Sequence, residues 1–210
     1  MSIPEWYHFF ERVENEIIAL RKVKTEVLNK TTETNQKAYQ AAVSEMDKIS
    51  EKYSDQLHGV RTTEFSVDVT DVGKIKGETD KILDGLFAET LGAVKNVCLP
   101  AEFEVAVDLA YMQCLREIEE IKEKSSGDDR ASILFESAKD DLVDVRGSAE
   151  LREQKSKIVE LSENWDREIA DGHESEFKES MEEEKEEIIK KITDHFKAIV
   201  QDYADAAGGG

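Results

Sequence analysis

The chain has 210 residues, of which 39% are hydrophobic and 36% are charged, and it contains only 2 prolines and 11 glycines. So few turn-forming residues exclude an all-β protein, whereas high charge suits amphipathic helices that each bury a single stripe. The formal net charge of −20 disfavours nucleic acid and anionic membranes as partners, because their phosphates would be repelled. No apolar run is long enough to predict a membrane-spanning helix.

A long helix is predicted first, over residues 4–58. Ser2 and Glu5 have the spacing of a capping box, and apolar residues then recur at alternating steps of four and three. Residues 29–37 are polar throughout and shift this register, so the alternative is a helical hairpin with its loop at that point. Because Gly, Pro and Asp are absent from the polar stretch, we favour the single helix.

Residues 61–77 interrupt the helical pattern. The alternation of Phe65, Val67 and Val69 is typical of extended backbone, and we expect a connector that lays these side chains on the bundle. Three shorter helices are predicted within 78–146. Their expected ranges are 78–97, 101–124 and 128–146.

The last third resembles the first in its pattern. Apolar residues at heptad spacing predict a long helical segment over residues 148–206, followed by a flexible glycine tail at 207–210. Residues 170–173 (Ala-Asp-Gly-His) fit either a tolerated glycine inside the helix or a turn. We therefore predict an all-α fold, a single elongated helical bundle over 1–206 with two long terminal helical segments and three shorter central helices.

The apolar stripes also predict which side chains form the core. The two long terminal segments are expected to lie alongside each other, with the shorter helices packed against them. The predicted core residues are Phe10, Ile17, Leu20, Met46, Ile49, Leu86, Leu91, Phe103, Val107, Tyr111, Leu115, Ile118, Leu134, Leu142, Ile158, Leu161, Trp165, Ile188, Ile192, Phe196 and Ile199.

The sequence shows no pattern typical of a catalytic or metal site. The four histidines are not at ligand spacing, and no nucleophile or phosphate-binding motif is present. Cys98 and Cys114 are expected to be free thiols, because a helix between them would separate their Cα atoms beyond disulfide reach. We therefore predict no catalytic residue, no cofactor and no metal ligand.

One aromatic cluster could mark a binding surface. Trp6, Tyr7, Phe9 and Phe10 crowd the start of the first predicted helix. They fit either a hydrophobic plug where chain ends meet or an exposed apolar patch for a partner helix or a lipid. We keep them as the candidate partner-binding patch, beside the plug as its structural alternative.

These observations predict a non-enzymatic acidic helical-bundle protein that acts as a structural or protein-interaction module, with a protein partner or self-association. The alternative function is a helical carrier of lipid or another apolar ligand. The absence of a visible signal peptide and the two expected free thiols favour the cytoplasm. A trimmed cell-surface or secreted bundle would show the same sequence features.

Overall fold

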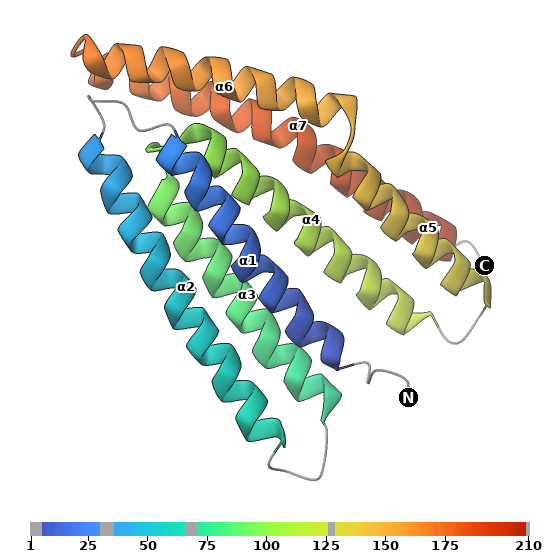
Figure 1. Cartoon of the computed structure of the whole chain (residues 1–210). Helices are drawn as coiled ribbons and strands as arrows, with labels where there is room; N and C mark the ends of the chain where they lie inside the picture. Colours follow the sequence, from blue (N-terminus) through green and yellow to red (C-terminus); the bar gives the residue numbers. More distant parts are fainter. Residues whose placement is uncertain (1–5, 30–35, 66–70, 126–128, 209–210) are drawn as a thin grey trace. The chain divides into compact units, whose positions relative to one another are not determined.

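The computed structural model describes residues 6–29, 36–65, 71–125 and 129–208, and in these residues the chain is all-α (Figure 1). The contacts divide the chain into two compact units, residues 1–102 and residues 103–210, here called unit 1 and unit 2. The helices are α1 (Tyr7–Asn29), α2 (Gln36–Phe65), α3 (Val72–Val94), α4 (Leu99–Lys124), α5 (Asp129–Arg146), α6 (Ala149–Ala170) and α7 (Glu174–Gly208).

Unit 1 is a three-helix bundle in which α1, α2 and α3 each pack against the other two. Every third or fourth residue of α1 is buried, as amphipathic spacing requires. Ion pairs then connect the helices at their rims: Lys24 Nζ lies 2.5 Å from Asp47 Oδ1, and Lys52 Nζ lies 2.7 Å from Glu89 Oε1. Apolar burial therefore provides the bundle's main driving force, and the charged pairs help fix its register.

The prediction of one helix over residues 4–58 is wrong. Helix α1 ends at Asn29, α2 begins at Gln36, and the two helices pack against each other, so the hairpin alternative is correct. The physical reason is that a polar stretch offers a continuing helix no apolar stripe to bury. Folding back instead buries the stripes of both helices against each other.

The prediction of an extended connector over 61–77 is also wrong at both ends. Helix α2 continues to Phe65, and α3 already begins at Val72, while Val67 and Val69 lie outside the described residues. Asp71 starts α3 as its N-cap, because its carboxylate accepts a hydrogen bond of 3.1 Å from the Lys74 amide. A short alternation of apolar residues could not distinguish helix ends from extended backbone.

The other central helices agree with the prediction to within two residues. Helix α4 begins at Leu99 rather than at residue 101, and α5 covers 129–146. Between α3 and α4 the chain turns at Asn96, whose φ is +58° and whose amide donates to the Glu102 carboxylate at 3.1 Å. Asparagine adopts this left-handed conformation with less strain than most residues, so the chain can turn sharply here.

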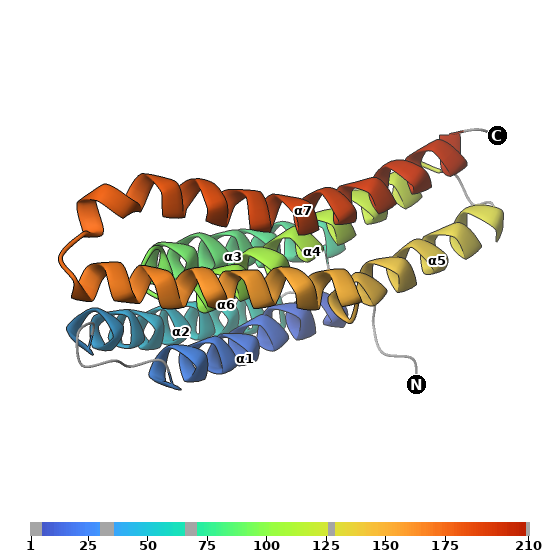
Figure 2. The same cartoon turned by 90° about the horizontal axis from the view of Figure 1, so that it is seen from above.

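In unit 2, the long C-terminal helix α7 runs along both α5 and α6 (Figure 2). The predicted segment 148–206 consists of α6 and α7, which form a hairpin with its turn at Asp171–His173. Gly172 has a φ of +80° there, which favours glycine, so residues 170–173 contain a turn. Helix α4 joins this group through an edge-to-face contact between Tyr111 and Phe196, with ring centroids 6.2 Å apart.

The core is largely as predicted. All the residues predicted for it are buried except Leu91, Tyr111, Leu134 and Ile199, which are half-buried. In α5, Leu142 is buried as predicted, but Phe135, which was not predicted, is buried beside the half-buried Leu134. Three buried polar side chains of α6 and α7 were not predicted: Gln154, Ser162 and Lys185.

Candidate functional site: the junction of α5 and α6

A network of polar contacts surrounds the junction of α5 and α6, where only Gly147 and Ser148 separate the two helices. The Ser148 hydroxyl accepts a hydrogen bond of 3.1 Å from the Leu151 amide and donates one of 2.7 Å to the Val145 carbonyl. Ser148 therefore caps the start of α6 and the end of α5 with one side chain. The chain bends here because glycine and a capping serine both favour a helix boundary.

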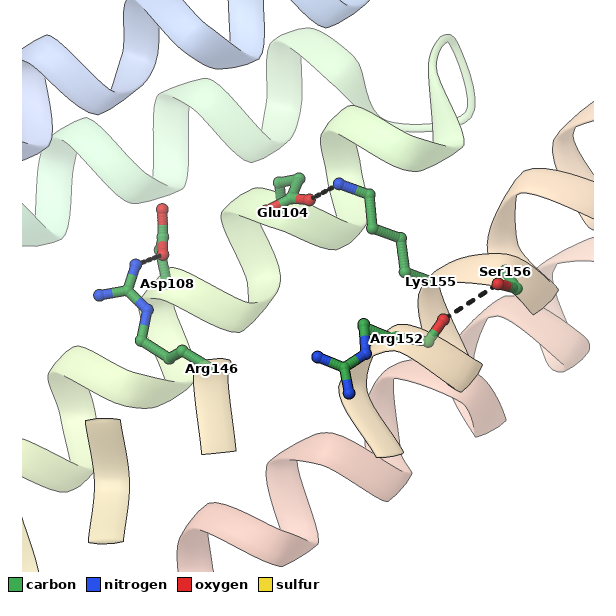
Figure 3. A network of polar contacts seen from close by, with 6 residues as sticks. All are labelled: Glu104, Asp108, Arg146, Arg152, Lys155 and Ser156. Atoms are coloured by element: carbon green, nitrogen blue, oxygen red, sulfur yellow. Dashed lines mark hydrogen bonds and ion pairs between the residues drawn. The ribbon is translucent and has the colours of Figure 1, made fainter. Parts of the chain in front are cut away.

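Basic side chains on both sides of the junction reach the same face of α4 (Figure 3). Arg146, at the end of α5, pairs with Asp108, and Lys155, in the second turn of α6, pairs with Glu104. Glu104 and Asp108 are four residues apart on a helix, so their carboxylates lie one turn apart on one side of α4. Two cations from two different helices are thus held by neighbouring anions on a third.

The Arg146 pair is the better shielded of the two. The Asp108 side chain is only 15% exposed, and the Arg146 guanidinium lies 4.6 Å from the centroid of the Tyr111 ring. A partly buried pair with a cation–π contact is screened less by solvent than an open surface pair. We therefore expect it to stabilise the packing of α5 more than the median exposed ion pair, which contributes about 0–1 kcal/mol.

Two further polar contacts complete the junction. The Arg152 guanidinium donates a hydrogen bond of 3.0 Å to the Gly147 carbonyl, which satisfies an acceptor at the end of α5. From α7, His195 Nδ1 lies 2.6 Å from Glu150 Oε2, in the first turn of α6. Polar groups of α4 and of α7 therefore both contact the chain within four residues of the bend.

Apolar packing is thin at the same place. Val145 and Ile158 are fully buried, but between them Leu151 is half-buried, and the remaining buried position is the polar Gln154. The Gln154 Oε1 atom has no hydrogen-bond partner among the described residues. A buried acceptor without a partner costs about 1–3 kcal/mol, so the α6 stripe is locally weak next to the junction.

Unit 1 contains a second cluster of titratable groups, between α2 and α3. The Lys52 ammonium lowers the pKa of Glu89 by its hydrogen bond, and the Tyr53 hydroxyl also bonds this carboxylate. Burial raises the pKa of Tyr53, and Glu89 adds to that effect. The Tyr53 ring lies directly over Gly85, where an added Cβ would be 2.4 Å from the hydroxyl oxygen, so the cluster fixes how closely the two helices approach.

The two cysteines are free, as the sequence predicted, and both are buried. Burial raises the pKa of the Cys114 thiol from 9.0 to about 11, with a smaller contribution in the same direction from Glu117 and an opposing one from Lys197. The thiol therefore stays protonated at neutral pH. Since the thiolate is the nucleophilic form, Cys114 is an inert core side chain.

The aromatic residues proposed as a partner-binding patch lie at the start of α1, in different environments. Phe10 is 1% exposed and belongs to the core of unit 1, and its ring meets that of Trp6 edge to face at 5.8 Å. Trp6 and Phe9 are half-buried, and Tyr7 is 39% exposed. The patch thus keeps an exposed edge around Tyr7, and its role in binding stays a prediction.

Two open grooves follow one another along the α1–α2 pair. One has a volume of about 530 Å³ and is lined by Leu20, Leu28 and Met46 together with charged residues such as Arg21 and Glu51. The other has a volume of about 430 Å³, with Ile17, Ile18 and Leu57 beside Glu14, His58 and Arg61. Charged rims over an apolar floor are the ordinary result of packing two amphipathic helices side by side.

The described part of the chain contains no group of three or more His, Cys, Asp or Glu side chains arranged to hold a metal ion. Within the same residues, no helix combines the length and the apolar character needed to cross a bilayer. No family model, curated protein or solved structure matches the chain. The functional interpretation therefore depends on the molecule's own charges and contacts.

The sequence predicted the helix boundary at the junction but not the ion pairs that connect the junction to α4. The predicted helical ranges 128–146 and 148–206 already placed a boundary at Gly147, where glycine and serine interrupt the helical pattern. The pairing of Arg146 with Asp108 was not predicted, because these residues are 38 positions apart and each reads as an ordinary exposed charge. Only the packing of α5 beside α4 brings them together.

Proposed function

We propose that this chain is a non-enzymatic, acidic helical-bundle protein that acts as a structural or protein-interaction module. The observation that supports this proposal is the concentration of carboxylates on the α6–α7 hairpin. Residues 160–187 carry 13 acidic and 3 basic side chains, a net charge of −10 out of −20 for the whole chain. The exposed carboxylates of this stretch are Glu160, Glu163, Asp171, Glu174, Glu176, Glu179, Glu183, Glu184, Glu186 and Glu187.

A charge of this density acts over about 8–10 Å at physiological salt. It repels anionic partners and speeds the encounter with a protein that presents a basic segment. Because α6 and α7 pack along their length, the carboxylates are presented on a preformed surface, which limits the ordering entropy lost on binding. The proposed partner is therefore a protein with a basic surface or segment.

The proposal is tested by affinity capture from the native source with three full-length baits. These are the parent chain, a variant with Glu176, Glu179, Glu183 and Glu187 changed to Gln, and a matched control. The control changes Glu45, Glu51, Asp55 and Asp84, exposed acidic residues of unit 1, to their amides.

We expect the parent and the control to retain the same basic proteins, identified by mass spectrometry, and the α7 variant to lose them. Retention should fall as salt rises from about 0.05 M to about 0.5 M, because the attraction is screened. Equal retention of the basic proteins by all three baits, or retention that does not change with salt concentration, would contradict the proposed role of the hairpin.

The alternative function is carriage of lipid or another apolar ligand, and it can be tested with the same purified chain. The α1–α2 grooves are open and partly charged, which does not favour an apolar ligand. We expect neutral lipid vesicles to leave the circular dichroism spectrum and the elution volume unchanged. A gain of helix signal or co-elution with vesicles would favour the carrier.

A further inference from the structure

The backbone at the α5–α6 junction lacks the hydrogen bonds that stiffen a continuous helix. The Gly147 and Ser148 amides bond only to carbonyls three residues earlier, at 3.1 Å each. The Leu151 amide bonds to a side chain instead of a carbonyl, and the regular ladder resumes where the Arg152 amide meets the Ser148 carbonyl at 3.2 Å. A helix with such an interruption bends there more easily than elsewhere.

Side-chain packing does not compensate for this interruption. Helix α5 buries Phe135, Ala138, Leu142 and Val145, and beyond them the next fully buried apolar residue of the tandem helices is Ile158. The direction of α5 relative to α6 is therefore fixed neither by a continuous backbone ladder nor by a continuous apolar stripe. Helix α7 packs along both α5 and α6, and close to the junction the ion pairs to α4 hold one residue on each side of it to a second common support.

We propose that α5 is a hinged element of unit 2, which turns away from α7 about Gly147 and Ser148 and is held in its packed position by the two ion pairs to α4. The pairs fix the hinge because Arg146 lies before it and Lys155 after it, while Asp108 and Glu104 belong to one rigid helix. This inference concerns a movement within the fold and does not depend on the proposed function.

Opening of the hinge would uncover a defined surface. Phe135 of α5 and Tyr203 of α7 face each other with ring centroids 6.4 Å apart, and Lys122 of α4 lies 4.2 Å from the Phe135 ring centroid. Turning α5 away would separate these contacts while α6 and the first half of α7 stay packed. Such a movement is a local opening, which amide hydrogen exchange measures directly.

The test is hydrogen exchange with mass spectrometry on the full chain, comparing Asp108→Asn with Asp140→Asn. Both variants remove one negative charge, but Asp140 is an exposed residue of α5, whereas Asp108 holds Arg146. For Asp108→Asn we expect the amides of 129–146 to exchange several-fold to about tenfold faster, since Arg146 loses the carboxylate that holds the end of α5 to α4. For Asp140→Asn we expect the parent's rate, and equal rates in the two variants would overturn the proposal.

The first half of α7, residues 174–190, serves as the internal reference. If Asp108→Asn accelerates exchange there as much as in α5, unit 2 opens as a whole and the hinge is refuted. A milder variant, Glu104→Gln, is compared with Glu160→Gln for the case in which Asp108→Asn unfolds the unit. We expect a smaller acceleration confined to 129–146 for Glu104→Gln only, and a uniform or absent effect would also refute the hinge.

Discussion

Unit 1 and unit 2 have nearly the same length but reach stability in different ways. Residues 1–102 carry 13 basic and 18 acidic side chains, net −5, whereas residues 103–210 carry 15 and 30, net −15. In unit 1 each helix packs against both others, and Tyr53 sits directly on the α3 backbone at Gly85. In unit 2 two helices share α7 in tandem, and a buried Gln154 lies close to their junction.

This difference shows where polar groups matter in an acidic helical protein. Where every helix has two neighbours, apolar burial fixes the arrangement, and surface ion pairs add only small amounts. Where two short helices follow one another along a longer one, the position between them depends on specific polar contacts. Unit 2 also contains more like charge, so its self-repulsion opposes folding more strongly. The variants below test this contrast, beginning with the largest expected effect.

The largest effect is expected from a charge placed in the core of unit 2. Ile192 is 1% exposed in α7, so Ile192→Asp buries a carboxylate and should destabilise unit 2 by about 4 kcal/mol or more. Ile133→Asp is the matched control, because it adds the same charge at a site that is 71% exposed and should change stability by less than about 0.5 kcal/mol. Urea unfolding followed by circular dichroism measures both. Similar midpoints for the two variants would mean that the α7 stripe is not the core of unit 2.

The next effect tests the close packing of unit 1. At Gly85 an added Cβ would lie 2.4 Å from the Tyr53 hydroxyl oxygen and 2.9 Å from two ring carbons, so Gly85→Ala forces α2 and α3 apart. We expect a loss of about 1–3 kcal/mol, typical of overpacking. Gly92→Ala, in the same helix with nothing within 4 Å of the new methyl group, should instead gain about 0.5–1 kcal/mol. A gain in both variants would show that Tyr53 can move at little cost.

The sequence predicted well what depends on local periodicity. The all-α class, the position of α4 and most of the core follow from apolar residues at helical spacing, and α4 was placed to within two residues. The 4–58 error arose because local spacing is equally good in one long helix and in two antiparallel ones. The decision between them belongs to tertiary burial, which no single segment reveals.

The junction could not be predicted for a related reason. Gly147-Ser148 identified a helix boundary, but the same dipeptide would occur in a loose loop or in a tight bend. Its capping hydrogen bonds and the Arg146–Asp108 pair require knowledge of which helix lies opposite. Gln154 shows the same limit, since a polar residue in a heptad stripe looks like an interruption of the stripe until its burial is known.

A third effect is a dependence of stability on alkaline pH. The Cys114 pKa is raised from 9.0 to about 11, so the folded thiol keeps its proton where the unfolded thiol has lost it. Its contribution to stability is therefore complete below pH 9 and is lost as pH rises from 9 towards 11. We expect about 1 kcal/mol of the decrease between about pH 9 and 10 to come from this group.

That contribution is isolated by comparing the parent with Cys114→Ala at each pH. Burial also raises the pKa of Tyr53 and of Tyr203, but both tyrosines are common to the two proteins and cancel in the difference. The free energies of unfolding should converge as pH rises, because the parent loses the thiol's contribution and the variant has none. Parallel pH profiles would mean that Cys114 contacts solvent in the folded chain.

The smallest effect should be a gain, and it addresses the weak stripe of unit 2 directly. Gln154 is 3% exposed and its Oε1 has no partner among the described residues, so Gln154→Leu replaces a buried side chain with one unsatisfied acceptor by an apolar side chain of similar size. We expect about 1 kcal/mol of added stability. Gln113→Leu, at an exposed position of α4, is the control and should change stability by less than about 0.5 kcal/mol. Slower amide exchange in 149–158, with no change in unit 1, would show that the leucine makes the apolar stripe of α6 continuous next to the hinge. Unit 2 would then depend less on polar contacts at the junction, as unit 1 already does. A loss of stability would instead show that the Gln154 amide contributes a favourable contact and that the junction is polar for a structural reason.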